Sequence, residues 1–172
     1  MTNAGGPPAF VTRLVLAATL APSYGIYSGY EHFENVPVRE GSEEYLNSEK
    51  YEIRERSLDG PLLPMMRRLN EIRHENPALQ HLSNVFWLDA GNDNLFAYAK
   101  VERGNAIIVV TNLDPHNAQA GVLTIPASLG LPPVFVVEDQ FTGWHFDWRI
   151  GQNYVELDPD YVGKQFHLLK AL

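Results

Sequence analysis

The sequence lacks cysteine, an excess of basic residues and any long hydrophobic run. Without cysteine there are no disulfides and no thiolate chemistry. Thirteen Lys and Arg against 21 Asp and Glu give a net charge of −8, which excludes nucleic acid and anionic membrane surfaces as expected partners. No apolar run reaches the roughly 18–20 residues that span a bilayer, and the opening MTNAGGPPAF has no basic region of a signal peptide. We therefore expect a cytoplasmic protein.

Motifs for metals and cofactors are also missing. A metal site needs clustered ligands, and the six histidines show no His-x-x-x-His or similar spacing. No glycine-rich loop of the phosphate- or dinucleotide-binding type is present. We expect no metal and no cofactor, and we interpret the histidines as packing or surface residues: His32, His74, His81, His116, His145 and His167.

The first part of the chain is predicted to form a helix, a short strand, a long polar loop and a second helix. Residues 10–20 are apolar on nearly every face, so this helix needs burial on several sides, and nothing else in the chain looks large enough to enclose it. The β-branched and aromatic residues 24–28 predict a strand, which suggests an α/β layer or barrel. Asp59 is a possible N-cap of the second helix, which ends at Asn76-Pro77. Its apolar stripe is Leu62, Met66, Leu69 and Ile72.

Beyond about residue 80, short β runs alternate with turns. This spacing predicts an antiparallel β-sandwich, and Gly151-Gln152 resembles a hairpin turn. We place the domain boundary between residues 1–80 and 81–172. The predicted strands are Val85–Asp89, Leu95–Val101, Ala106–Asn112, Gly121–Ile125, Val134–Glu138, Trp144–Ile150, Asn153–Leu157 and Gln165–Lys170.

Two stretches suggest sugar binding. Lys50 and Tyr51 place a hydrogen-bond donor beside an aromatic ring, which suits sugar hydroxyls and an apolar sugar face, although any surface Lys-Tyr pair looks the same. Trp144, Phe146 and Trp148 share one face of a strand, which is a sugar platform or, as we favour, the sandwich core. Most carboxylates of the loop are interpreted as a solvated acidic face, with Glu31 the one held structurally: Glu31, Glu34, Glu40, Glu43, Glu44, Glu49 and Glu52.

A family resemblance appears at PSYGIYSGYE, residues 22–31. This stretch resembles the last barrel strand of α-amylase-family enzymes. The fuller pattern, GGPPAF, LAATLAPSYGIYSGYEHFEN and NSEKYE in residues 5–52, closely resembles the α-glucan:maltose-1-phosphate maltosyltransferases of that family. The resemblance implies an α/β plus all-β fold class, in which the terminal segment of a (β/α)8 barrel precedes a C-terminal antiparallel β-sandwich.

The resemblance also implies a function. Such enzymes transfer maltosyl from maltose 1-phosphate to the non-reducing end of an α-1,4-glucan, with retention, and release phosphate. Lys50 and Tyr51 match the pair that binds the maltosyl unit, while no residue matches the catalytic carboxylates. We therefore expect this chain to be inactive alone, to need the remainder of the barrel, and to form part of a homodimer in the intact enzyme.

Two alternatives stay open. The chain could be a non-catalytic β-sandwich module for α-glucan binding or subunit contacts. Alternatively, a separate chain could supply the barrel.

Overall fold

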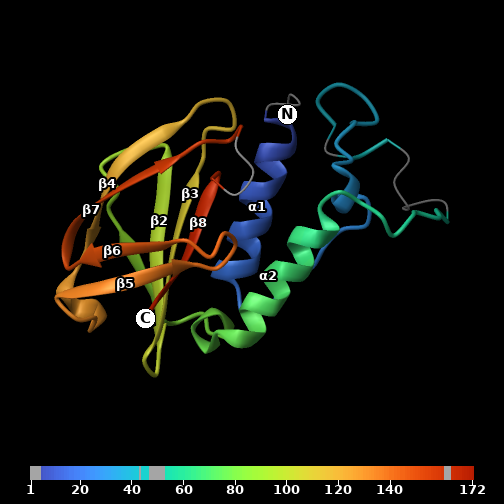
Figure 1. Ribbon diagram of the computed structural model, residues 1–172. Coiled ribbons are helices and arrows are strands. Elements are labelled where there is room, and N and C mark those ends of the chain that lie inside the picture. The colour runs from blue at the N-terminus through green and yellow to red at the C-terminus, as the bar shows by residue number, and fades with distance from the viewer. Residues whose placement is uncertain (1–4, 43, 47–52, 161–163) are drawn as a thin grey trace.

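The computed structural model describes residues 5–42, 44–46, 53–160 and 164–172. A six-stranded sheet lies between a two-stranded sheet on one face and two helices on the other. The segment that joins the helices lies on the far side of them from the sheets (Figure 1). The fold is mostly antiparallel sheet with few helices.

All eight predicted strands are present, and their ends differ from the predicted ones by at most two residues. The prediction succeeds because each run is short, β-branched or aromatic, and bounded by turn residues. The strands are β1 (Val85–Leu88), β2 (Leu95–Glu102), β3 (Asn105–Asn112), β4 (Gln119–Ile125), β5 (Val134–Asp139), β6 (His145–Arg149), β7 (Gly151–Leu157) and β8 (Phe166–Ala171).

The strands form two antiparallel sheets, in the orders β1-β2-β3-β8-β5-β6 and β4-β7. The predicted hairpin at Gly151-Gln152 is wrong, because β6 pairs with β5 and β7 pairs with β4. Gly151 has a φ of 96°, which redirects the chain from one sheet to the other. The Asn153 side chain holds this crossing, since its Oδ1 accepts from Arg149 N at 3.0 Å and its Nδ2 donates to Arg149 O at 2.8 Å.

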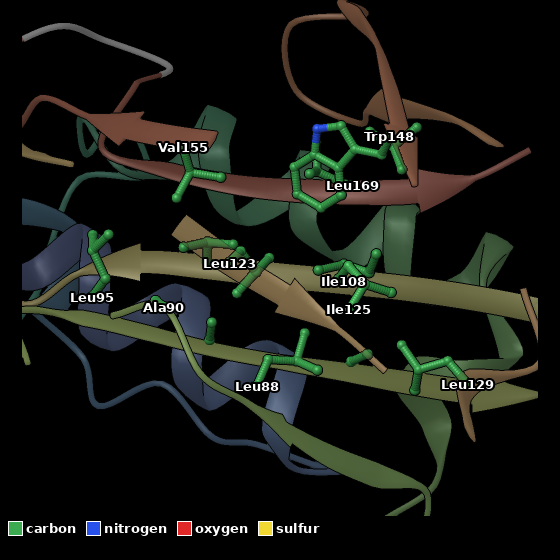
Figure 2. Close-up of a cluster of buried hydrophobic side chains, with 14 of the residues drawn as sticks. Leu88, Ala90, Leu95, Ile108, Leu123, Ile125, Leu129, Trp148, Val155 and Leu169 are labelled. Atoms are coloured by element: carbon green, nitrogen blue, oxygen red, sulfur yellow. The ribbon is translucent and has the colours of Figure 1, made fainter. Parts of the chain in front are cut away.

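One hydrophobic core fills the space between the two sheets (Figure 2). Leu123, Ile125 and Leu157 of the small sheet meet Ile108 and Leu169 of the large one, and all five side chains are essentially buried. Each such side chain contributes about 1.5–3 kcal/mol by its removal from water. The predicted antiparallel β-sandwich is thus confirmed.

The stripe of Trp144, Phe146 and Trp148 only partly belongs to this core. Trp148 is 6% exposed and packs in the core, and Phe146 is half-buried against it. Trp144 is 50% exposed, so the favoured core interpretation is wrong for this residue. The reason is that β6 is the edge of its sheet, and Trp144 lies in the turn before it, beyond the densely packed centre.

The two predicted helices are α1 (Gly6–Leu20) and α2 (Leu63–Glu75). All four stripe residues of the second helix are buried, as predicted. The predicted N-cap is wrong: α2 begins one turn later, with Pro64 in its first turn, and Asp59 instead accepts a hydrogen bond from Ser57 Oγ. In the described ranges, no helix is long and apolar enough to cross a membrane.

The apolar first helix is covered by this chain on one side, further than expected, while Val11, Leu16 and Leu20 stay partly exposed. Phe10, Leu14 and Val15 pack in a second core with α2 and with the outer face of the large sheet. That face contributes Tyr98, Val109 and Leu168, residues that alternate along their strands with those of the sandwich core. The large sheet is therefore covered on both faces, which explains the unbroken apolar run of β3.

The predicted strand over residues 24–28 does not form. Residues 24–27 carry no regular secondary structure, and residues 28–29 form a turn. A strand is stabilised by hydrogen bonds to a neighbour, and no strand of the described part of the chain lies beside this stretch.

The carbonyl end of α1 is capped by two cations from other elements. Lys100 of β2 is fully buried, and its Nζ donates to Thr19 O at 3.1 Å and Leu20 O at 3.2 Å. Arg73 of α2 donates to Ala18 O, and to Ala21 O at 3.0 Å. The last turn of α1 has no basic residue of its own, so these side chains satisfy its carbonyls and complement the helix dipole.

We predict that stability rises with pH in the window where Lys100 titrates. Burial, and secondarily the charge of Arg73, lowers the pKa of Lys100 from its ordinary 10.5 to about 8. Between these values the unfolded chain binds more protons than the folded one, so the free energy of unfolding increases with pH. Urea denaturation should show a gain of about 1–2 kcal/mol from pH 7.5 to 9.5.

The Lys100→Met variant should lose most of that pH dependence, even if its absolute stability changes. Arg67→Met, at an exposed position of α2, is the matched control and should keep the wild-type slope. An unchanged slope in Lys100→Met would show that Lys100 does not titrate in this range.

Candidate functional site

The candidate site is the segment between α1 and α2, residues 21–62. Lys50 and Tyr51, the sugar-binding residues predicted from the sequence, lie outside the described residues. The described parts on either side of them define how the segment is anchored and which side chains surround its ends.

A glycine starts the segment's turn away from α1. Gly29 has a φ of 96°, a conformation that side chains with a Cβ rarely adopt. Its carbonyl accepts from His32 N and Glu34 N, each at 3.1 Å. A Cβ at this position would lie 2.3 Å from Glu34 Oε2 and would displace that carboxylate, while the backbone angle itself favours glycine.

Glu31 joins the beginning of the segment to its end. Its Oε2 accepts from Gly29 N at 3.0 Å, and its backbone carbonyl accepts from Leu62 N at 3.2 Å. Gly60 packs so closely that a Cβ there would lie 2.7 Å from Glu31 O. Glu31 is held structurally, as predicted, but it is not alone in this, because Glu34 is also held.

A bidentate ion pair makes a second connection between the beginning and the end of the segment, residues 28–34 and 56–62, which together we call its base. Arg56 donates from Nε and Nη2 to the two carboxylate oxygens of Glu34, at 3.0 and 2.9 Å. Its Nη1 also donates to Ser28 Oγ at 3.1 Å. The hydrogen bond from Arg56 lowers the pKa of Glu34. Arg56 could not be found from the sequence, because 22 residues separate it from Glu34 and no local spacing links them.

Aromatic rings fix this base on the first helix. The Phe10 ring of α1 contacts the rings of Tyr30 and Phe33, with centroids 4.9 and 5.4 Å away. The Tyr30 hydroxyl donates to Phe10 O at 2.6 Å, and burial raises the pKa of Tyr30 to about 12. The base is thus a packed extension of the helical layer.

The outer part of the segment exposes apolar side chains around a small pocket. Backbone hydrogen bonds from Val38 N to Glu44 O (2.8 Å) and from Leu46 N to Val36 O (2.7 Å) form a short arm. Beside it lies a pocket of about 230 Å³, lined by Glu34, Asn35, Val36, Tyr45, Leu46 and Arg54. Exposed apolar side chains also occur along the rest of the segment; together with those of the pocket they are Ile26, Tyr27, Val36, Val38, Tyr45, Leu46, Ile53 and Leu58.

The described carboxylates of the segment fall into two groups. Glu31 and Glu34 are both engaged in hydrogen bonds that hold the base, and Glu40 and Glu44 are exposed. Within the described ranges, no group of three or more His, Asp or Glu side chains is placed to hold a metal. The segment therefore offers donors, aromatic rings and apolar surface to a ligand or partner.

Comparison with known proteins finds similar sequences. Residues 87–170 match the family described as "GLGE, C-terminal". Over 90% of its length, the chain is 46% identical to alpha-1,4-glucan:maltose-1-phosphate maltosyltransferase 2 of Streptomyces coelicolor and 45% identical to the corresponding enzyme of Mycolicibacterium smegmatis. It is 41% identical to that of Salinibacter ruber over 97% of its length. The chain spans about a quarter of the length of these relatives.

Solved structures agree at the level of the fold. The alpha-amylase of Geobacillus thermoleovorans, complexed with acarbose, matches 96% of this chain and 34% of its own, with a TM-score of 0.66 at 15% identity. AmyP E221Q in complex with maltotriose matches 94% of this chain and 34% of its own, with a TM-score of 0.67 at 15% identity. Residues 87–170 thus match the GLGE C-terminal family, and over 90% of its length the chain is similar to a part of the alpha-1,4-glucan:maltose-1-phosphate maltosyltransferases.

Proposed function

We propose that this chain is the C-terminal part of a retaining maltosyltransferase that moves maltosyl from maltose 1-phosphate to the non-reducing end of cytoplasmic α-1,4-glucans. The observation that carries the proposal is 41–46% identity to curated maltosyltransferases over 90% of the chain. Catalytic carboxylates are then supplied by parts of the enzyme outside this chain.

In this proposal, residues 1–80 are the last segment of a (β/α)8 barrel and residues 81–172 are the C-terminal domain. Residues 24–28 are the last barrel strand, which forms against a neighbouring strand supplied by the remainder of the barrel. Ile26 and Tyr27 are 42% and 52% exposed, and contact with the remainder of the barrel would cover them. Active sites of such barrels are built from the loops that follow the strands, which is the position of residues 29–60.

Lys50 and Tyr51 bind the donor sugar in this account. A lysine donates hydrogen bonds to sugar hydroxyls, and a tyrosine offers a ring for the apolar face of the sugar. The contacts of Glu31, and the ion pair of Glu34 with Arg56, hold together the base of the loop. That loop carries Lys50 and Tyr51. The intact enzyme is proposed to be a homodimer.

A non-catalytic role is the second candidate, favoured by the exposure of Trp144. In that case the sandwich binds glucan without contributing to donor binding. The two candidates differ in whether substitutions in residues 29–60 change turnover, which the following experiments measure.

The first prediction concerns turnover. A chimera in which this chain replaces the matching C-terminal segment of the Streptomyces coelicolor enzyme should release phosphate from maltose 1-phosphate with maltohexaose as acceptor. The isolated chain should release none under the same conditions. Steady release by the isolated chain, or a folded but inactive chimera, would contradict the proposal.

The second prediction concerns donor binding. In the chimera, Lys50→Ala should lower kcat/KM for maltose 1-phosphate about 10- to 100-fold, because a hydrogen bond to a charged group is lost. Arg39→Ala, which removes another exposed cation of the same segment, is the control and should leave kcat/KM unchanged. If both variants behave like the parent chimera, Lys50 has no role in donor binding.

The third prediction concerns the ion pair at the base of the loop. Arg56→Met removes the bidentate pair with Glu34, so the loop is held less firmly and KM for maltose 1-phosphate should rise several-fold. The unfolding midpoint should fall modestly, because the Arg56 side chain is largely buried while that of Glu34 is partly exposed. Arg67→Met on α2 should change neither quantity. A KM equal to that of the parent would separate this ion pair from donor binding.

A further inference from the structure

One flank of α1 is apolar and only partly buried. Successive residues of an α-helix are about 100° apart, so Leu14 and Leu16 point about 160° away from each other. Leu14 is 1% exposed and packs in the second core, whereas Leu16, and Leu20 one turn further along, stay partly exposed. The second core therefore leaves the flank with Leu16 and Leu20 partly open.

The large sheet extends beyond α1 on this same side. Thr19 follows Leu16 by three residues and lies next to it on the helix surface, and Thr19 Oγ1 is 2.5 Å from the Tyr98 hydroxyl of β2. The next strand outward is β1, which forms an edge of the sheet. α2 lies toward the other edge, since Arg68 donates to Gln140 O just after β5. The open flank of α1 and the edge strand β1 are thus neighbours.

Three aromatic rings lead from the second core out to this edge. The ring centroid of Phe96 lies 5.7 Å from that of Tyr98 and 5.6 Å from that of Trp87. Trp87 is directly opposite Tyr98 in the β1–β2 pairing, so both side chains are on the face that carries the helices. Exposure rises outward: Tyr98 is fully buried, Phe96 is partly buried, and Trp87 is 65% exposed.

The second core therefore continues past α1 as an exposed apolar surface. We call it the flank surface, and its residues are Leu16, Leu20, Trp87 and Phe96.

The spacing of the layers suits a helix at this place. Packed helices lie roughly 8–10 Å apart and neighbouring strands about 4.8 Å apart, so one helix covers about two strands. α1 covers β2 and β3, because Thr19 contacts Tyr98 of β2 and Thr12 Oγ1 donates to Asn112 O of β3 at 3.1 Å. The next place in the helical layer is over β1, where Trp87 is exposed.

We propose that the helix preceding α1 in the (β/α)8 barrel packs on the flank surface, with Trp87 as its main contact on the sheet. The identity of this partner rests on the proposed function. The helices of such a barrel form an outer ring, in which α1 has a neighbour on each side and α2 is one of the two. The continuity of the flank surface with the second core supports a partner of the same kind, a helix with an apolar stripe.

The proposal also specifies the chemistry of the partner helix. It brings apolar side chains to Leu16 and Trp87. It also offers an acceptor to the indole N–H of Trp87, because a buried Trp usually has a hydrogen-bond partner. With this helix in place, the sheet, α2, the last barrel strand and the preceding helix surround α1. The apolar character of residues 10–20 on nearly every face then has a physical reason.

Photocrosslinking in the chimera identifies what covers the flank surface. p-Benzoylphenylalanine in place of Trp87 should crosslink, within one polypeptide, to the last barrel helix of the Streptomyces coelicolor part, as mapped by mass spectrometry of the peptides. The same replacement at Trp144, near the opposite edge of the large sheet, is the matched control and should not reach that helix. A crosslink from position 87 to another element, or between two polypeptides, would overturn the proposal.

Hydroxyl-radical footprinting measures the wild-type side chains. The oxidation rate of Trp87 should be about fivefold or more lower in the chimera than in the isolated chain, because its exposed fraction falls from 65% to that of a core residue. Trp144, which is 50% exposed, should react equally in both. Equal rates at Trp87 would refute docking. So would a Trp87 rate in the isolated chain that falls with protein concentration, since a second copy would then be the occupant.

A stability comparison separates docking from folding. Trp87→Ala should lower the unfolding midpoint of the chimera by several degrees more than that of the isolated chain, because only the chimera buries the ring fully. Trp144→Ala should change the two midpoints alike. An equal effect of Trp87→Ala in both proteins would contradict the proposal.

The outcomes are distinct from those of the proposed function. A folded chimera in which Trp87 is protected and crosslinks to the barrel helix, but which releases no phosphate, would refute the maltosyltransferase role alone. A chimera that turns over while Trp87 reacts as fast as in the isolated chain would refute the docking surface alone.

Discussion

The carbonyl end of α1 is the point on which the arrangement of this chain depends. The helix is apolar and has no basic residue in its last turn, so its final carbonyls need donors from elsewhere. Lys100 reaches them from the sheet and Arg73 reaches them from α2. The Thr19 and Tyr98 hydroxyls, 2.5 Å apart, add a third connection at the same place. One turn of helix thus joins three elements that lie far apart in the sequence.

This junction decides where the loop segment starts. Just after α1, the carbonyl of Pro22 also accepts from Arg73 at 2.8 Å. The Cζ atom of Arg73 lies 5.1 Å from the centroid of the Tyr24 ring. The other end is fixed by the Phe10 and Tyr30 contacts and by Glu31. Residues 29–34 and 56–62, the two ends of the loop segment, are therefore anchored on the helical layer.

Local sequence patterns predicted the helices and strands of the fold. Contacts between residues far apart in the sequence could not be predicted. The eight strands and the stripe of α2 follow from short periodic runs, so they were correct. The Gly151 crossing was mistaken for a hairpin, because turn chemistry does not say which strands pair. The burial of Lys100 and the pairing of Glu34 with Arg56 join residues 22 or more positions apart, and no spacing reveals them. Lys50 and Tyr51 come from family resemblance and stay a prediction, as does the domain boundary at residue 80.

The central claim is that the helical layer and the sandwich form one cooperative unit joined at the carbonyl end of α1. Native-state hydrogen exchange of the whole chain tests it most directly, because amides that open together exchange with the same free energy. The account predicts that amides of the second half of α1, such as Val15 and Ala18, exchange only with the global opening that also releases Ile108 and Val110 of β3. Exchange of the α1 amides through a separate opening of much lower free energy would contradict it.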